Sequence, residues 1–285
     1  MPDSVQDTAN AAQIDYWNLT AGKVWAEMQA QLDRQIEPLG LKALEAFDVQ
    51  PGERVLDIGC GCGQTTVSLA QRVGVSGAVT GADISRPMLE VARARPVPAG
   101  AATPAFREID AQTGDLGEAV FDAAFSRFGV MFFADPVAAF ANIGRSLKPG
   151  GRLVFVCWRP LAENPWMRAP MEAAAHLLPP MTPSDPRAPG PFAFADPARI
   201  WDLLDAAGYR AIDARPFDTS IGGSPLEQTV SLSFRVGPLG SALRENPQLA
   251  EPARAAVTAA LKPYETPEGV MMPAAVWIVR AGWPS

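Results

Sequence analysis

Three glycines alternate with other residues at Gly59, Gly61 and Gly63, directly after an apolar stretch at 55–58. Glycine adopts positive φ at little cost and lets a ligand approach the backbone closely, so this spacing indicates a tight turn around a ligand. Apolar residues with helical spacing follow at 64–70, and the first turn of a helix presents free N–H groups. The strand, turn and helix together predict a cradle for a nucleotide-like ligand.

The spacing of the loop limits which ligand it can hold. A dinucleotide fingerprint needs a third glycine at position 64, which is Gln64 here, so a nicotinamide-dependent oxidoreductase is disfavoured. No Gly-Lys-Ser/Thr follows the loop, which excludes a phosphate loop of the Walker type. Instead, Asp57 precedes the first glycine by two residues.

Two more carboxylates end predicted strands. Asp83 follows the apolar segment 78–82, and Asp110 follows 106–109. The carboxyl ends of parallel strands meet at one edge of a sheet, so we expect both side chains near the loop. Asp83 could accept hydrogen bonds from ribose hydroxyls, and Asp110 from the exocyclic amine of an adenine. With Asp57, three acids at successive strand ends indicate a site for an adenosine-containing ligand.

Strand and helix patterns alternate along the middle of the chain. The expected strands are residues 55–58, 78–82, 106–109, 121–126 and 152–158, and the expected helices between them are 64–70, 86–95 and 136–147. Residues 211–217 and 275–280 supply the last two strands. This order predicts an α/β fold with a Rossmann-like, doubly wound, seven-stranded and mostly parallel sheet.

The N-terminal segment 12–36 has helical spacing, and Pro38 and Gly40 predict an interruption before a second helix at 41–47. The apolar residues Trp17, Val24, Trp25, Met28 and Leu32 fall on one face of the first helix. Two interpretations are open for Trp17 and Trp25: contacts in the core, or a lid that closes over the cradle.

Residues 159–197 contain ten prolines and one helical stretch, 165–178, which indicates an inserted helical cap. Asp196 and Pro197 open another helix that ends at Gly208, and a helix is expected at 252–261. The predicted organisation is an N-terminal lid at 1–48, a cofactor domain at 49–158 and 196–285, a cap insertion at 159–195 and a second insertion at 219–272.

Five segments carry a resemblance to a known family: VLDIGCGCG (55–63), GADIS (81–85), DA (110–111), FDAAFSRFGVMFF (121–133) and LKPGGRLVFVCW (147–158). In order and spacing they resemble class I S-adenosylmethionine-dependent methyltransferases, in the small-molecule branch similar to the ubiquinone/menaquinone C-methyltransferases. The resemblance covers residues 50–158. It does not extend through the cap or beyond Phe217.

The resemblance implies a methyltransferase that uses S-adenosyl-L-methionine and releases S-adenosyl-L-homocysteine. It implies that the loop backbone faces the methionine part, that Asp57 orients its amino group, and that Asp83 binds the ribose. The remaining residues that it assigns to the cofactor are Gly59, Cys60, Gly61, Gly63, Ile84, Asp110, Ala111 and Ser126, with Trp17 or Trp25 closing over it. Arg127 would lie beside the reactive methyl, and the apolar walls for the acceptor would come from Phe128, Phe132, Trp158, Trp166, Met167 and Met171.

A sulfonium methyl is a strong electrophile, so the protein has chiefly to align the acceptor and exclude water. A hydroxyl or acidic-carbon acceptor would benefit from a general base. The one histidine, His176, is a weak candidate, with packing or surface exposure as the alternative, and Tyr16, Tyr209 and Tyr264 are weaker still. No other catalytic residue is assigned.

The charge of −7 and pI near 4.9, with no run of Lys or Arg, argue against nucleic acid as a partner. No apolar run reaches the roughly 20 residues of a membrane span, and the N-terminal MPDSVQDTAN lacks the features of a secretory signal, so we expect a cytoplasmic protein. Three cysteines form no disulfide framework, and Cys60 and Cys62 are too few for a zinc site, so no metal is expected.

The expected partner is therefore a small-molecule acceptor, bound by a monomer or a homodimer. The accepting atom, oxygen, nitrogen or carbon, stays open. A protein that binds S-adenosylmethionine without transferring methyl, as a regulator or a cyclase, is the alternative, because its cofactor loop would look the same.

Overall fold

The structure is a computed structural model that describes residues 10–179 and 185–285. Residues 1–9, which are most of the segment judged above for a secretory signal, lie outside the described residues. Residues 180–184 of the predicted cap also lie outside them. Within the described residues, no helix is long and apolar enough to cross a membrane.

A central sheet has the strand order β3-β2-β1-β4-β5-β8-β6, and a short strand, β7, pairs with β8. The strands are β1 (Arg54–Ile58), β2 (Ala78–Asp83), β3 (Ala105–Glu108), β4 (Phe121–Arg127), β5 (Leu147–Trp158), β6 (Arg210–Ser224), β7 (Glu265–Thr266) and β8 (Gly269–Gly282). Strand β8 is antiparallel to both β5 and β6, and the other long strands run parallel. The predicted α/β fold with a mostly parallel sheet is confirmed: the seven expected strands are the seven in this order, and β7 adds an eighth. The strand order reverses on either side of β1, where doubly wound sheets bind their ligands.

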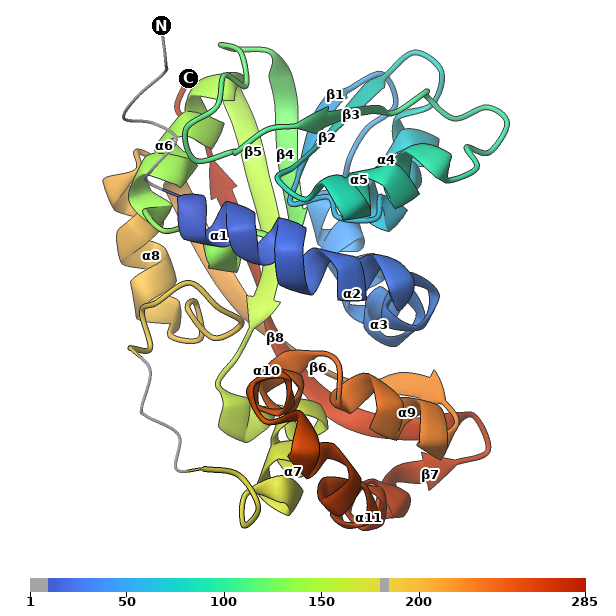
Figure 1. The fold of residues 1–285 in the computed structure, drawn as a ribbon. Coiled ribbons are helices and arrows are strands. Elements are labelled where there is room, and N and C mark those ends of the chain that lie inside the picture. The colour runs from blue at the N-terminus through green and yellow to red at the C-terminus, as the bar shows by residue number, and fades with distance from the viewer. Residues whose placement is uncertain (1–9, 180–184) are drawn as a thin grey trace, which may run out of the picture.

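Helices cover both faces of this sheet (Figure 1). Phe47 packs on Phe125 of β4 with ring centroids 5.3 Å apart, and Phe140 packs on Phe155 of β5 at 5.6 Å. Phe125 is the register partner of Val154, the neighbour of Phe155, so the two phenylalanines of the sheet point to opposite faces. These two contacts are made by α3 (Gln29–Phe47) and α6 (Pro136–Ser146). The other helices beside the sheet are α4 (Gln64–Val73), α5 (Arg86–Ala94) and α8 (Pro197–Ala206).

The predicted break at Pro38 and Gly40 is wrong, because α3 is continuous from Gln29 to Phe47. Proline removes one hydrogen bond from a helix interior, but packing of the apolar face on the sheet outweighs that loss. This face buries Leu39, Ala43, Leu44 and Phe47 completely or nearly so. Conversely, the segment before α3, expected as one helix, is divided into α1 (Ala11–Asp15), a π-helical turn (Tyr16–Thr20) and α2 (Ala21–Glu27).

A second, smaller apolar core lies beyond the carboxyl ends of the sheet strands, in the lower part of Figure 1. It is built by α7 (Pro165–Ala174), α9 (Leu226–Ser233), α10 (Gly237–Glu245) and α11 (Ala250–Leu261), with residues of β8. Helix α7 ends four residues before the predicted position, and α9 and α10 were not predicted. Strands β6 and β8 are longer than expected and continue from the sheet into this region, so the two predicted insertions pack together. We call this unit the helical cap.

Candidate cofactor and acceptor site

A cavity of about 400 Å³ lies at the strand-order reversal, within the usual size range of ligand pockets. Its wall combines the N-terminal helices, the loops after β1 to β5 and the helical cap. The structure brings together on this wall most of the residues expected from the sequence: Trp17, Trp25, Gly59, Cys60, Gly61, Asp83, Ile84, Asp110, Ala111, Arg127, Phe128, Phe132, Trp158, Trp166 and Met167. Tyr16 also lines it.

The glycine loop is held against its neighbours too closely for side chains. Gly59 has φ +62°, and a Cβ atom there would lie 2.7 Å from the Cα of Gly129 in the loop after β4. The Gly59 N–H donates to the carbonyl oxygen of Ala82 at 2.8 Å, and the Gly61 N–H donates to Asp83 Oδ2 at 2.7 Å. Gly63, with φ +79°, is the N-cap residue directly before α4 and lies off the cavity wall, in contrast to the prediction. The loop is therefore fixed by the protein's own contacts, without help from a ligand.

Asp57 lies behind the loop, fully buried. Its Oδ2 atom accepts hydrogen bonds from the hydroxyls of Thr65 at 2.8 Å and Thr66 at 2.6 Å. Its Oδ1 atom is buried and has no partner among residues 10–179 and 185–285. Burial raises the pKa of Asp57 to about 6, although the two hydroxyls and the Arg127 charge oppose this rise. Asp57 does not line the cavity, but a buried carboxylate oxygen without a partner places negative charge directly behind the loop, which favours a cationic group of a ligand in front of it.

Asp83 and Asp110 present carboxylates at the ends of neighbouring strands. Asp83 accepts from the backbone N–H of Ser85 at 2.8 Å as well as from Gly61, and burial raises its pKa. Asp110 accepts from the N–H of Gln112 at 2.8 Å and from Asn10 Nδ2 at 3.1 Å. A carboxylate has about four acceptor positions, so both can take further donors from a ligand.

The N-terminal helices are fastened over this end of the cavity. Asn18 donates to the carbonyl oxygen of Ile84 at 2.8 Å, and the hydroxyl of Ser85 donates to the carbonyl oxygen of Trp17 at 2.8 Å. A Cβ atom at Gly22 would lie 1.9 Å from that same Trp17 oxygen, so the π-helical turn requires glycine there. The segment from α1 to the first half of α3 is called the lid below.

The sequence left two interpretations open for Trp17 and Trp25, packing contacts or a lid over the cavity, and the structure shows both kinds of contact. Trp17 packs edge-to-face on Phe132, with ring centroids 5.0 Å apart, and on Trp25 at 6.1 Å. Both tryptophans also line the cavity. They are packing residues and cavity walls at once.

Aromatic rings form the wall between the glycine loop and the helical cap. Phe128 and Trp158 are stacked, with centroids 4.2 Å apart and an angle of 8° between their planes, and Trp166 follows at 5.0 Å from Trp158. Phe128 has φ +63°, a conformation that costs a non-glycine residue about 1–2 kcal/mol. In this conformation its ring stacks on Trp158 and lines the same cavity as the glycine loop.

A buried ionic cluster borders the same wall. Arg127 donates to Asp33 Oδ1 at 3.3 Å and to Gln64 Oε1, and Asp33 Oδ2 forms an ion pair with Arg95. Burial lowers the pKa of Arg127, whereas the charge of Asp33 raises it. Asp33 lines the cavity but was not predicted, because one acid on an amphipathic helix gives no local signal.

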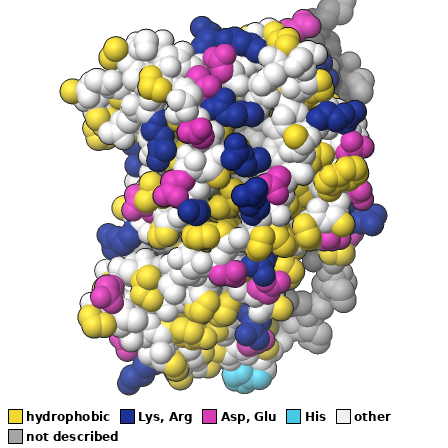
Figure 2. Space-filling view, turned by 180° about the vertical axis from the view of Figure 1, so that it is seen from behind, with side chains coloured by type: hydrophobic (Ala, Val, Ile, Leu, Met, Phe, Trp, Pro, Cys, Tyr) yellow, Lys and Arg dark blue, Asp and Glu magenta, His cyan; other side chains and the backbone are white. Residues whose placement is uncertain are grey.

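Some predicted residues lie elsewhere. Ser126 is buried beneath the loop, where its hydroxyl donates to the Ile58 carbonyl oxygen at 2.8 Å, and Met171 belongs to the core of the helical cap. His176 is exposed on the cap, where it is the cyan side chain in Figure 2, and does not line the cavity. Tyr209 is buried in the sheet core, and Tyr264 packs on the core of the cap.

The loop cysteines carry neutral thiols. Burial raises the pKa of Cys62 to about 12 and that of Cys60 well above its ordinary value. In the described part of the chain, no group of three or more His, Cys, Asp or Glu side chains is arranged to hold a metal ion.

Comparisons with known proteins agree with this geometry. The family described as "Methyltransferase domain" matches residues 56–155. The O-methyltransferase cnsE of Penicillium expansum is 32% identical over 251 residues, which are 85% of this chain and 81% of that enzyme. The nocamycin O-methyltransferase of Saccharothrix syringae is 28% identical over 232 residues, 78% of this chain and 81% of that enzyme.

Two further relatives match differently. The ubiquinone/menaquinone biosynthesis C-methyltransferase UbiE of Teredinibacter turnerae is 39% identical over 112 residues, only 39% of this chain and 45% of that enzyme. The phosphoethanolamine N-methyltransferase 2 of Haemonchus contortus, solved with S-adenosyl-L-methionine, shares the fold with a TM-score of 0.59 at 18% identity. The structural match covers all of this chain and 62% of the chain of that enzyme.

The chain belongs to the S-adenosylmethionine-dependent methyltransferases that act on small molecules. The expected cofactor, enzyme class and small-molecule acceptor are confirmed. The residues present fit the cofactor: Gly59 and Gly61 bring bare backbone to the cavity wall, and the carboxylates of Asp83 and Asp110 lie on that wall with acceptor positions to spare.

Proposed function

We propose that this enzyme transfers methyl to an oxygen atom of its acceptor. Two relatives that match it along about four-fifths of their length are O-methyltransferases, whereas UbiE matches over only 112 residues. A match of that length is too short to include the lid, the cofactor domain and the helical cap together. The long matches therefore bear more on the accepting atom.

The structural observation that carries methyl transfer itself is a single continuous wall. It begins at Gly59 and Asp83 and continues through Phe128 and Trp158 to Trp166 on the cap. The lid lies on one side of this space and the cap on the other. Such an enclosure aligns the acceptor and excludes water, which are the main tasks for methyl transfer.

We assign the following roles to residues on the cofactor side. Asp57 accepts from the amino group, Asp83 from the ribose and Asp110 from the adenine edge, while the lid tryptophans close the site. The bound cofactor supplies an electrophilic methyl group. Ser126 acts indirectly, because its hydroxyl bonds both the Ile58 carbonyl and the Gly129 N–H and so holds the β1 and β4 ends together.

Arg127 is the cationic group of the acceptor side. Its buried guanidinium lies on the cavity wall, and a fixed positive charge favours the ionised form of a nearby hydroxyl. We therefore propose that the acceptor hydroxyl is acidic and loses its proton to solvent before transfer. The exposed His176 has no part in this step.

The proposal is tested with methyl-labelled S-adenosylmethionine and a panel of hydroxylated aromatic acceptors. We expect S-adenosylhomocysteine as the co-product and a labelled product whose methyl is released by hydroiodic acid, which cleaves methyl ethers and esters but not C-methyl groups. Methylthioadenosine as the co-product, or label resistant to hydroiodic acid, would show that the proposed reaction is wrong.

We further propose that the enzyme acts in the cytoplasm as a monomer or a homodimer. Its three cysteines are free and buried, as in proteins of reducing compartments. Light scattering of the purified protein measures the assembly.

A further inference from the structure

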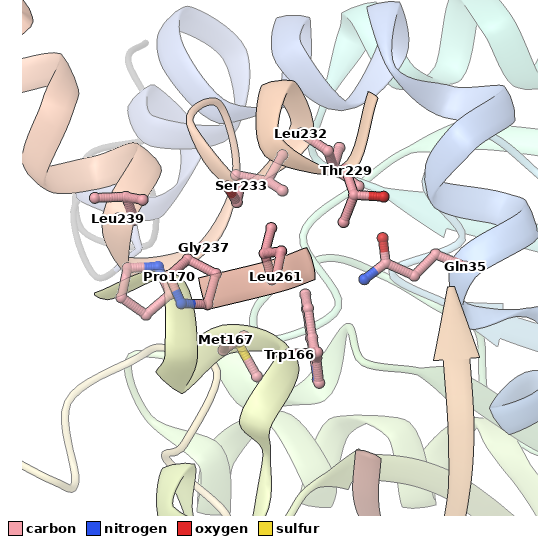
Figure 3. A pocket seen from close by; sticks show the side chains of 12 residues that line it. Gln35, Trp166, Met167, Pro170, Thr229, Leu232, Ser233, Gly237, Leu239 and Leu261 are labelled. Atoms are coloured by element: carbon pink, nitrogen blue, oxygen red, sulfur yellow. The ribbon is translucent and has the colours of Figure 1, made fainter. Parts of the chain in front are cut away.

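A small side pocket of about 30 Å³ adjoins the acceptor end of the large cavity. Six residues line both spaces: Gln35, Trp166, Met167, Val236, Gly237 and Pro238. The side pocket lies where the lid helix α3 meets the helical cap (Figure 3). A space of this size holds one water molecule or one small substituent of a ligand.

Gln35 brings an amide into this pocket without any partner. The residue is 8% exposed, and its amide borders the pocket without a hydrogen-bond partner among residues 10–179 and 185–285. Figure 3 shows the amide pointing from α3 into the space between Thr229 and Trp166. A buried amide without a partner costs about 1–3 kcal/mol, which a protein recovers only if something else meets that group.

Trp166 brings a second unpaired group. Its indole N–H is buried, and no acceptor for it exists in the described part of the chain. The other polar side chains of the pocket are already used, since the hydroxyls of Thr229 and Ser233 donate to the backbone carbonyls of Pro225 and Val230. Gln35 from the lid and Trp166 from the cap thus line the same small space, and each has a polar group without a partner in the described part of the chain.

The surroundings indicate the chemistry of the missing partner. All twelve residues that line the side pocket are uncharged, and most of them are apolar. A charged substituent would be desolvated there without a counter-ion, so the partner is neutral. The indole N–H only donates, whereas the Gln35 amide donates through its NH₂ and accepts through its carbonyl oxygen. An oxygen atom of the partner can therefore accept from both residues.

We propose that Gln35 and Trp166 form a subsite for a neutral oxygen substituent, such as a carbonyl, of a planar aromatic acceptor. The aromatic rings of Phe128, Trp158 and Trp166 line the large cavity beside this pocket and offer apolar contact to an aromatic acceptor. The acceptor thus has its methylated oxygen near the glycine loop and its second oxygen in the side pocket. This inference rests on the proposed function and adds the substrate class.

The binding test uses a matched pair of probes, 2-hydroxyanthraquinone and 2-hydroxyanthracene, which differ in the ring carbonyls. Equilibrium dialysis is carried out with protein saturated with S-adenosylhomocysteine. We expect the wild type to bind the quinone at least tenfold more tightly than 2-hydroxyanthracene. Gln35→Leu and Trp166→Phe should each remove about tenfold of quinone affinity and leave 2-hydroxyanthracene binding unchanged.

The matched control is Gln228→Leu, because Gln228 is exposed on α9 of the same cap and lines neither space. It should bind both probes as the wild type does. A wild type that does not prefer the quinone, or a Gln35→Leu variant that keeps the preference, overturns the subsite. If the side pocket holds only water, the Gln35→Leu variant keeps the preference for the quinone.

A stability measurement needs no acceptor. If Gln35 is kept for a ligand, Gln35→Leu removes an unpaired buried amide and should raise the Tm of the ligand-free protein by about 2–4 °C, with no rise in Gln228→Leu. A lower Tm in Gln35→Leu would identify the amide as structural instead and overturn the proposal. Calorimetry with S-adenosylhomocysteine separates the two claims, because lost cofactor binding in the wild type refutes the proposed function, whereas intact binding with unchanged probe preference refutes only the subsite.

Discussion

The side-chain amide of Asn18 donates a hydrogen bond of 2.8 Å to the carbonyl oxygen of Ile84. The same side chain accepts from the N–H of Arg86 at 2.9 Å, so it bridges the lid to the loop between β2 and α5. This loop follows Asp83, the residue assigned to the ribose. The lid is thereby coupled to the cofactor side of the cavity rather than to the acceptor side alone.

Asn18→Ala should loosen this attachment. The variant loses the two hydrogen bonds to the β2–α5 loop, each worth about 1 kcal/mol, and one to the Ile14 carbonyl within the lid, so we expect the dissociation constant of S-adenosylhomocysteine to rise about tenfold. Calorimetric titration measures this constant. The control is Asn246→Ala on the cap, whose amide donates only within its own helix region and which does not line the cavity. Equal affinities in the wild type and Asn18→Ala would exclude a role of the lid in cofactor binding.

Asp57 predicts the pH dependence of cofactor binding. Its pKa of about 6 lies above the ordinary 3.8, so it is half protonated near pH 6 and ionised at pH 7.5. The cationic amino group binds the ionised form, so affinity should fall about tenfold for each pH unit below about pH 6. Asp57→Asn should bind weakly and without this dependence, as titrations between pH 5 and pH 8 will show.

The same shift affects the protein without ligand. A carboxyl whose pKa is raised in the folded state contributes most to stability below its unfolded value near 3.8, and this contribution is lost as the pH rises through about 6. Saturating S-adenosylhomocysteine should therefore raise the Tm more at pH 7.5 than at pH 5. Equal shifts at the two pH values would argue against an ionised Asp57 in the complex.

The cofactor side could be predicted from the sequence because its signals are local. Asp57, Asp83 and Asp110 each follow or end an apolar strand pattern, and the order of strands places them at one edge of the sheet. Gln64, in place of a third glycine, is by itself enough to disfavour a dinucleotide site. The family resemblance covers the same residues.

The acceptor side depends on tertiary contacts that no local pattern contains. Asp33 and Gln35 are polar residues on an amphipathic helix, and only the packing of α3 against the sheet and the cap turns them toward the cavity. Pro38 predicted a helix end because the energy of packing on the sheet is absent from the local pattern. Helices α9 and α10 are short and depend on the core of the cap.

Asp33 is predicted to stabilise the fold as well as to border the cavity. It lies between Arg127 and Arg95 and is 13% exposed at its side chain. Removing one member of a largely buried ionic cluster leaves the others unpaired, so Asp33→Ala should lower the free energy of unfolding by about 2–4 kcal/mol. Glu45→Ala on the same helix, 63% exposed in its pair with Lys42, should cost less than about 1 kcal/mol. Urea denaturation of both variants measures the difference.

Two variants of Phe128 separate the effect of backbone strain from the effect of losing the ring. Both Phe128→Gly and Phe128→Ala remove the ring stacked on Trp158, so both should lose acceptor affinity to a similar extent. Only glycine adopts φ +63° freely, so the glycine variant should be more stable than the alanine variant by about 1 kcal/mol. If alanine proves the more stable of the two, the backbone at 128 is not strained in solution.

The central claim is that the cavity at the strand-order reversal binds the methyl donor through Asp83. Its most direct test is calorimetric titration of the wild type and of Asp83→Ala with S-adenosylhomocysteine at pH 7.5. We predict one site in the wild type and a dissociation constant about 10 to 100 times larger in Asp83→Ala, the loss expected for hydrogen bonds to a charged group. No binding by the wild type, or the same affinity in Asp83→Ala, would contradict it.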